Sequence, residues 1–457
     1  MKLPSPTITI LGQDPNRSHR INANSFQQNA ITAVKGWQYA AFYTAVLPGK
    51  SGSGCRVNLA RRQLPLDQVE ASTTEWQVLT FEDYEQTRDD GHDTISIGVC
   101  EGDGTIHVAF DHHCDQLKFR MSKIDVASNP SSHVWVTSLF TETRSYLPGI
   151  ETGDLLKEVT YPRFVAIGKD LLFTHRTGQA GLGSDLLHRY SSSSHQYTLI
   201  GQHLMGVANS PYINGIDYRK DRLHISWCYR KFVITQSPVV TPHVHQQQSG
   251  PNGPENNYDL YYAFSDDRGV TWKNSEGRVI ACMTGGDGIE TSSIKPGVDI
   301  ARVYEIPMGS GILNQEGQAA DWDGGFWVLN REKVGGEERW IVYYRNPEGT
   351  WTRMVIDSVP EPTETGSRGS VCTDRKGDVY LVLPGNSDPS LNIMRARKEE
   401  QYSRFEPVWM LDGYDGEPLV DVQRLETSDV LSVFTRTSAG VDGKRDVVVL
   451  DLLLTEL

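Results

Sequence analysis

The sequence predicts an all-β protein, a seven-bladed β-propeller, on three observations. Long helical periodicity is nearly absent, and short apolar or alternating runs are separated by Gly, Asp, Asn and Pro, which is typical of strands joined by tight turns. Units of three or four such runs recur at the length of a propeller blade along the 457 residues. One turn, SDDRGVTW at residues 265–272, fits the Asp-box pattern that occurs on propeller hairpins.

The repeating units define one domain over residues 1–457, and each unit reads as one blade. The expected units span 37–79, 92–140, 160–204, 211–280, 314–356, 368–411 and 416–454. A strand at 7–11 or at 30–34 is expected to complete the last unit and close the ring, because closure removes exposed sheet edges.

The Asp-box turn is interpreted as structural. Asp267 can accept hydrogen bonds from backbone N–H groups of the turn, Gly269 permits a positive φ, and Trp272 is expected to fill the space between blades. This motif therefore predicts fold and not function.

The charge and residue patterns of the chain argue against several kinds of binding partner. The net charge of −14 argues against general nucleic-acid binding, although a cleft can be locally basic on an acidic protein. The sequence contains no run of 18 apolar residues, so a membrane-spanning helix is not expected. The six cysteines are scattered and form no CxxC pair. His243 and His245 lie in a Pro/Gln-rich insertion at 236–257, which is interpreted as a solvated loop and not as a metal site.

The first candidate for chemistry is the segment 92–122, which reads as two strands joined by a Gly-Asp-Gly turn. His92 lies at one end, and His112 and His113 lie at the other. A hairpin brings its ends together, so these imidazoles are expected to converge, with Asp93 and Asp111 alongside. Imidazole is well suited to proton transfer near neutral pH. Ordinary backbone hydrogen bonding at strand ends is the alternative.

Two further motifs lie in the third unit. In TYPRF (160–164), Pro162 is expected to force Tyr161 into an extended conformation, with Arg163 on the same face. In FTHRTGQAGLGS (173–184), Arg176 ends a strand before a Gly-rich loop, and its planar fork of donors is suited to a carboxylate. Blade packing is the alternative for Tyr161.

Later units add candidates for substrate binding. Equivalent ends of successive blades converge near the propeller axis, so side chains at the starts of units are expected on one face. The candidates are Tyr212, Asn214, His224, Trp227 and Arg230 in one hairpin and Asn314 and Gln315 at the start of another unit. Trp227 is suited to stacking on a sugar, although a core position is favoured for a lone Trp. No paired carboxylates of the glycosidase type are readable.

The ordered set of these motifs resembles the BNR-repeat family of polysaccharide lyases, which includes ulvan lyases and rhamnose–glucuronate lyases. The resemblance rests on HDTISIGV…GDGTIHVAFDHH, TYPRF, FTHRTGQAGLGS, PYINGIDY, DLYYAFSDDRGVTW and NQEGQAAD, and covers about residues 80–330. It implies β-elimination at a glucuronate whose O4 carries L-rhamnose. The family's catalytic set of two histidines, a tyrosine and an arginine falls on His92, on His112 or His113, on Tyr161 and on Arg176, and the expected spacing favours His112.

The resemblance also implies roles for the catalytic residues, a cofactor requirement and a cellular location. Arg176 with one histidine neutralises the uronate, His112 or Tyr161 takes the C5 proton, and Tyr161 or His92 protonates O4. The chemistry requires no cofactor, while the family allows a structural calcium. We expect a secreted monomer acting on an anionic polysaccharide of rhamnose and glucuronate, although the N-terminal residues do not resemble a signal peptide. The alternatives are a propeller rhamnosidase or sialidase-like hydrolase and a non-catalytic carbohydrate-binding propeller.

Overall fold

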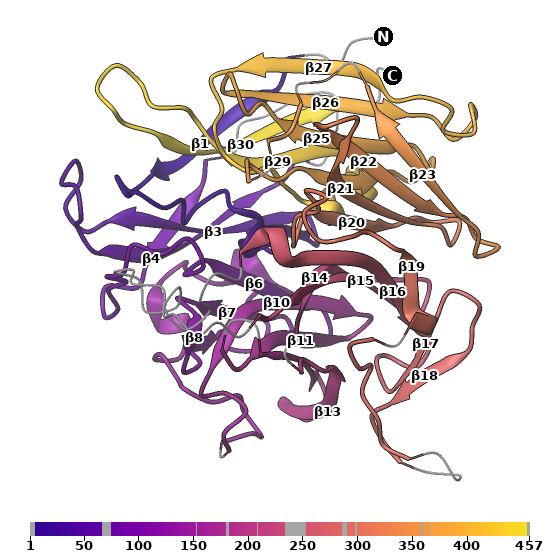
Figure 1. Cartoon of the computed structure of the whole chain (residues 1–457). Helices are drawn as coiled ribbons and strands as arrows, with labels where there is room; N and C mark the ends of the chain where they lie inside the picture. Colours follow the sequence, from indigo (N-terminus) through magenta and orange to yellow (C-terminus); the bar gives the residue numbers. More distant parts are fainter. Residues whose placement is uncertain are drawn as a thin grey trace.

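The computed structural model describes residues 5–454 except for 66–74, 152, 180–181, 208, 234–252, 286–289, 298, 358, 360 and 364. Within these residues the strands form seven sheets that follow one another around the molecule, so that the indigo first blade meets the yellow last blade (Figure 1). The predicted seven-bladed β-propeller is confirmed. The described part contains no apolar helix long enough to span a bilayer. His243 and His245 lie outside the described residues.

The first three sheets carry the candidate catalytic residues. Blade one contains β2 (Ile31–Val34), β3 (Trp37–Ala45), β4 (Cys55–Gln63) and β5 (Gln77–Thr80). Blade two contains β6 (Ile95–Cys100), β7 (Thr105–Phe110) and β9 (Phe119–Met121). Blade three contains β10 (Val159–Ile167), β11 (Asp170–Thr177), β12 (Ser184–Ser191) and β13 (Gln196–Leu204), with β8 (His113–Asp115) added at the edge of β10.

The remaining sheets complete the ring. Blade four contains β14 (Asn209–Arg219), β15 (Arg222–Lys231), β16 (Asn257–Ser265), β17 (Thr271–Lys273), β18 (Val279–Cys282) and β19 (Arg302–Tyr304). Blade five contains β20 (Gly317–Ala320), β21 (Phe326–Val334), β22 (Glu337–Arg345) and β23 (Trp351–Ile356). Blade six contains β24 (Ser370–Thr373), β25 (Val379–Pro384), β26 (Ser390–Ala396) and β27 (Glu406–Asp412). Blade seven contains β28 (Leu419–Val420), β29 (Val430–Arg436), β30 (Asp446–Leu453) and β1 (Thr7–Gln13).

Helical structure is confined to short connections in the described residues. They are η1 (Ser25–Gln27), η2 (Pro130–Ser132), η3 (Thr137–Leu139), η4 (Pro254–Asn256), η5 (Asp299–Ala301) and α2 (Val422–Ser428). Of these, η1 matters for function, because it carries Phe26 toward the candidate site.

The N-terminal strand β1 closes the ring. It pairs antiparallel with β30, with Thr7 opposite Asp451, so the last blade is completed by the first residues of the chain. Of the two strands considered for this role, residues 7–11 are therefore correct. Residues 30–34 instead form β2, which pairs with β3 and gives blade one a strand that the unit expected at 37–79 omits. A four-residue strand has too short a pattern to reveal its partner.

The core lies between neighbouring blades. One apolar cluster joins Leu172 and Leu187 of blade three to Trp227 and Trp272 of blade four. In the turn before Trp272, Asp267 accepts a hydrogen bond from the Thr271 N–H group at 2.7 Å, and Gly269 has a φ of +93°. Trp272 is fully buried, so burial of large side chains between blades stabilises the ring.

The strands β6 and β7 form the predicted histidine hairpin. Ile95 pairs with Phe110 at its open end, and the Gly-Asp-Gly turn closes the other end. The chain then leaves the blade at Asp111, which has a φ of +61°, and His113 pairs with Thr160 of β10. This crossing between blades places the two adjacent histidines in different surroundings.

Candidate active site

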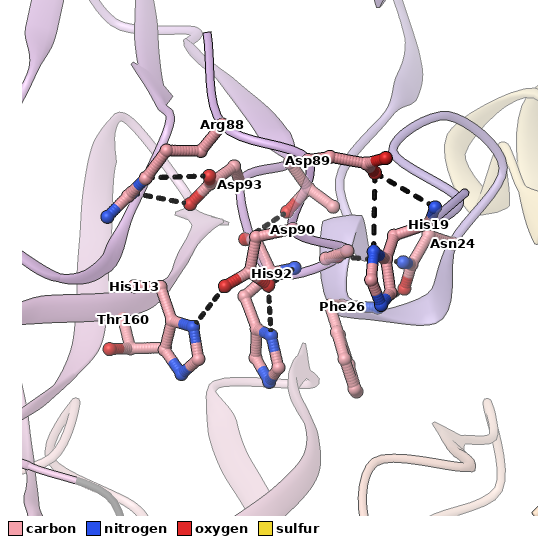
Figure 2. A network of polar contacts seen from close by, with 12 residues as sticks. His19, Asn24, Phe26, Arg88, Asp89, Asp90, His92, Asp93, His113 and Thr160 are labelled. Atoms are coloured by element: carbon pink, nitrogen blue, oxygen red, sulfur yellow. Dashed lines mark hydrogen bonds and ion pairs between the residues drawn. The ribbon is translucent and has the colours of Figure 1, made fainter. Parts of the chain in front are cut away.

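Asp90, His92 and His113 form the centre of the candidate site (Figure 2). Nδ1 of His92 lies 2.6 Å from Oδ1 of Asp90, and Nδ1 of His113 lies 2.7 Å from Oδ2. The two imidazole rings stack with their centroids 3.8 Å apart and 16° between their planes. Burial acts to raise the pKa of Asp90, but the hydrogen bonds and charge of the two histidines lower it far below its usual range.

His112 lies outside this centre, which corrects the preference for it over His113. Its side chain is fully buried, and its Nε2 accepts a hydrogen bond from the Lys118 N–H group at 2.7 Å. Burial, followed by the charge of Lys118, holds the pKa of His112 well below its usual range. The physical reason is the crossing at Asp111, which places His113 beside Asp90 and His92 and leaves His112 in the interior.

Asp93 and Asp111, the acids expected beside the histidines, contact other partners. Asp93 pairs with Arg88 at 2.9 Å, and Asp111 lies 3.5 Å from Nζ of Lys118. Burial, with the nearby charge of Asp111, raises the pKa of Asp93. No local signal marks Asp90, because Asp89, Asp90 and Asp93 all lie within three residues of His92, and only the folded chain shows which one contacts both rings.

Tyr161 lies beside the histidine pair, held in a backbone conformation that the sequence did not predict. Its φ is +57°, and the β10–β11 register shifts between Thr160 and Arg163, so Tyr161 sits in a bulge and is not extended. Its ring contacts Phe26 at 5.1 Å and His92 at 5.6 Å between centroids. Packing offsets the cost of this conformation, which is about 1–2 kcal/mol. Burial raises the pKa of Tyr161, so the phenol stays protonated at neutral pH.

Arg176 completes the group. Its side chain is 1% exposed, its Cζ lies 5.0 Å from the centre of the Tyr161 ring, and its Nη1 donates to the hydroxyl of Tyr212 at 3.2 Å. Within the described part of the chain no carboxylate pairs with it. Burial opposes the charge, but Tyr212, Tyr161 and Cys114 outweigh burial and raise the pKa of Arg176 above its usual value.

A basic and aromatic wall continues from Arg176. Cζ of Arg230 lies 4.6 Å from the centre of the Tyr212 ring, and its Nη2 donates to Oδ1 of Asn314 at 2.9 Å. Nε of Arg368 donates to the backbone oxygen of Asn314 at 2.7 Å, and its Cζ lies 4.7 Å from the centre of the Phe26 ring. Phe26 and Arg368 come from distant parts of the chain, and no sequence signal pointed to them.

Two predicted sugar-binding residues belong to the core. Trp227 is fully buried and stacks on Tyr261 with centroids 5.4 Å apart. His224 stacks on Phe326 at 5.4 Å, and its Nδ1 lies 2.8 Å from the hydroxyl of Tyr262. Neither side chain is available to a ligand in this structure, because neighbouring blades cover both.

Three other predicted binding residues are also buried. Arg163 bonds Gln28 through Nε, and burial lowers its pKa to about 10. Asn214 donates to Oγ of Ser226 at 3.0 Å. Gln315 is fully buried beside Asn314. Tyr212 and Asn314 are also buried, but their hydrogen bonds with Arg176 and Arg230 place them, with Arg230, in the wall beside Arg176.

A cavity of about 580 Å³ lies along the propeller axis, separate from the histidine pair. Its lining includes Phe164, Val165 and Ala166 near the end of β10, whereas Thr160 and Tyr161 lie near the start of that strand. None of the four residues His92, His113, Tyr161 and Arg176 lines it. The candidate chemistry therefore lies toward the other end of the inner strands.

Asp90, His92 and His113 are also the described group whose spacing could suit a metal ion, with ligand atoms within 4.8 Å of one another. The lone pair of an imidazole nitrogen lies in the plane of its ring. Two nearly parallel rings, 3.8 Å apart, direct these lone pairs side by side and not toward one point. The geometry fits hydrogen bonds to two oxygens better than one shared ion. The structural calcium remains a prediction.

Comparison with known proteins agrees with this architecture. A model of the BNR repeat-containing family matches residues 37–359. The chain belongs to the BNR repeat-containing family. This family member is similar to the long isoforms of ulvan lyase from Alteromonas sp. (strain LOR) and Pseudoalteromonas sp. (strain PLSV), with 24% identity over 41% of the chain in each case. The matched region spans about a fifth, 21%, of each relative.

Solved structures show the same fold. The polysaccharide lyase Uly1 superposes with a TM-score of 0.69 at 15% identity, covering 99% of this chain and 100% of that one. An ulvan lyase of family PL25 superposes with a TM-score of 0.63 at 12% identity, covering 96% and 95% of the two chains. The latter enzyme has also been solved bound to -[GlcA(1-4)Rha3S]-. The BNR-family chain thus shares its whole propeller with these proteins.

Proposed function

We propose that this BNR-family protein is a polysaccharide lyase that cleaves the L-rhamnose-α-1,4-D-glucuronate linkage by β-elimination. The observation that carries the proposal is the buried guanidinium of Arg176, which has no carboxylate partner among the described residues and lies beside Tyr161. A buried cation without a counter-ion is costly, so a ligand carboxylate is its natural partner. The similar ulvan lyases, one of them bound to -[GlcA(1-4)Rha3S]-, support a uronate ligand.

The proposed reaction starts with neutralisation of the glucuronate carboxylate by Arg176. This makes the C5 proton more acidic, because negative charge that develops at C5 spreads onto the neutralised carboxylate. A base removes the C5 proton, and the electrons of the C5–H bond form the C4–C5 double bond. The C4–O4 bond breaks, and O4 leaves with rhamnose after receiving a proton. Side chains supply every charge and proton, so the reaction requires no metal or organic cofactor.

The geometry supports a division of labour between His92 and Tyr161. The side chain of His92 is 29% exposed against 8% for His113, and its ring contacts Tyr161. His92 is therefore the proposed base, with His113 stacked behind it. Tyr161, whose pKa is raised by burial, is the proposed acid for O4, because a protonated phenol can donate.

The proposed substrate is an anionic polysaccharide that contains rhamnose and glucuronate, such as ulvan or gum arabic. Arg176, Arg230 and Arg368 form a basic wall near the histidine pair on a protein whose net charge is −14. We further propose that the enzyme acts outside the cell as a monomer.

The decisive experiment incubates the protein with ulvan and, separately, with gum arabic, and follows the ultraviolet absorbance of an unsaturated uronate. A lyase raises this absorbance in step with new reducing ends. Reducing ends without the absorbance would identify a hydrolase, and binding without either product would identify a carbohydrate-binding propeller. Arg176→Ala serves as the inactive control, since a trace contaminating lyase would still act in that preparation.

A further inference from the structure

We propose that Asp90 is a positioning residue that sets one tautomer on both imidazoles, with Nδ1–H toward Asp90 and the lone pair on Nε2. The catalytic meaning of this inference rests on the proposed lyase function. The tautomers themselves belong to the resting protein and can be measured without substrate.

The contacts of Asp90 allow one arrangement of protons. A carboxylate only accepts hydrogen bonds, and both of its oxygens face an Nδ1 atom, at 2.6 Å for His92 and 2.7 Å for His113. The backbone N–H of His92 also donates to Oδ1, at 2.9 Å. A bare Nδ1 lone pair at these distances would face a negative oxygen, which is repulsive. Each Nδ1 therefore carries a hydrogen, and each Nε2 atom is turned away from Asp90 (Figure 2).

The stack of rings fixes the direction of these nitrogen atoms. His92 lies between Phe26, at 4.9 Å and 26°, and His113, at 3.8 Å and 16°. The pair contacts the titratable groups Asp90, Tyr161 and Asp115, and Asp115 accepts the backbone N–H of His113 at 3.0 Å. Two stacked imidazolium ions would repel each other, and the single negative charge of Asp90 balances only one of them. The pair is therefore expected to take up one proton and not two. Asp90 thus supports His92 as it takes a proton and leaves His113 neutral.

Asp90→Asn tests this tautomer assignment with little change of shape. The amide oxygen is expected in the place of Oδ1, where it still accepts the backbone N–H and Nδ1–H of His92, so the amide nitrogen faces His113 and requires a bare Nδ1 on that ring. That second ring must then carry its neutral-state hydrogen on Nε2. One of the two rings loses its Nε2 lone pair, while stacking and volume are retained.

The first measurement is the ¹⁵N spectrum of the histidine rings in the resting protein, with His92→Gln and His113→Gln used for assignment. Both rings are expected as Nδ1–H in the native protein, and one is expected as Nε2–H in Asp90→Asn. Asp89→Asn is the matched control, because Asp89 is the adjacent aspartate and bonds His19 instead. An Nε2–H tautomer on either ring of the native protein, or unchanged tautomers in Asp90→Asn, would overturn the inference.

The second measurement is turnover. Asp90→Asn is expected to lower kcat about 100-fold with little change in KM and to displace the pH profile, because a neutral amide no longer stabilises the proton that His92 takes, and general-base catalysis contributes about 100-fold or more. Asp90→Ala is expected to recover part of its activity with added formate, because the side chain of Asp90 is 23% exposed and a small carboxylate can reach its place. Asp89→Asn should retain native turnover.

The two proposals fail differently. If no substrate is eliminated, the lyase function fails, while the ring spectra still decide the role of Asp90. If elimination occurs and Asp90→Asn turns over like the native protein, the role of Asp90 fails and the lyase function stands. Formate that restores nothing to folded Asp90→Ala also contradicts a role for the carboxylate.

Discussion

His113 pairs with Thr160, the residue directly before Tyr161, in the ladder between β8 and β10. A histidine that follows the hairpin of blade two is therefore attached by backbone contacts to the inner strand of blade three. The relative position of the histidine pair and Tyr161 depends on a sheet and not on a flexible loop. Such rigid placement is what proton transfer between nearby groups requires.

Arg176→Ala is expected to lower kcat/KM about 100-fold to 1,000-fold, the usual cost of removing a donor that stabilises developing negative charge. Arg176→Lys should recover little, because an ammonium lacks the planar fork of a guanidinium. Initial rates of ultraviolet absorbance on ulvan or gum arabic measure the effect. Arg189→Ala, which removes a surface partner of Asp170 in the same blade, is the control with near-native rates. Equal rates for both variants would reject the role of Arg176.

Tyr161→Phe keeps the aromatic contacts with Phe26 and His92 but removes the hydroxyl group. We expect kcat to fall about 100-fold or more, with KM and the melting temperature nearly unchanged, since general-acid catalysis contributes at least that much. Steady-state kinetics and a thermal melt measure the two effects. Tyr218→Phe loses a hydroxyl that bonds Asp221 at the surface and should retain native kinetics.

Replacing His113 is expected to affect mainly turnover, whereas replacing His112 is expected to affect mainly stability. His113→Ala should abolish most turnover at a modest cost in stability. His112→Ala should lower the free energy of unfolding by about 1–3 kcal/mol, because its Nε2 is the acceptor for the buried N–H of Lys118. Urea denaturation and turnover per folded molecule separate the effects. The reverse pattern would restore His112 as the reactive histidine.

Acid is expected to destabilise the fold through buried neutral histidines. Burial lowers the pKa of His107 to about 3, of His175 to about 4 and of His224 to about 3. In the unfolded chain these groups have a pKa of about 6.5, so below that pH the unfolded state binds protons that the folded state does not. The free energy of unfolding therefore falls as pH decreases from about 6.5 toward 4, by up to about 1.4 kcal/mol per pH unit for each histidine.

Urea denaturation at a series of pH values tests this acid effect. His175→Phe retains an aromatic ring in contact with Phe173 and His188. It should make the free energy of unfolding fall less steeply with decreasing pH, by the contribution of one histidine. His19→Phe, at a half-exposed position, is the control for the loss of a histidine at the surface. A free energy of unfolding that stays constant between pH 7 and 5 would contradict the expectation.

Short sequence patterns were sufficient to predict the fold and part of the candidate site. Strand alternation and Gly/Asp turns predicted the propeller, and the hairpin of β6 and β7 followed from residues within twenty positions of one another. Arg176 was predicted because an arginine that ends a strand before a Gly-rich loop is a local signal. In contrast, Trp227 and His224 were proposed for a ligand, yet neighbouring blades cover them, and no local pattern reports what packs on the other side of a sheet.

The sequence by itself determined the fold class and the chemical types near the site, because hydrogen bonding within hairpins and apolar alternation depend on a few adjacent residues. Only the tertiary structure decided that His113 and not His112 joins His92, and that Asp90 and not Asp93 bonds both rings. It also brought Phe26 and Arg368 to the site from distant parts of the chain. The physical reason is that positive φ values at Asp111 and Tyr161 break the strand alternation, and packing between blades determines where those irregular residues point.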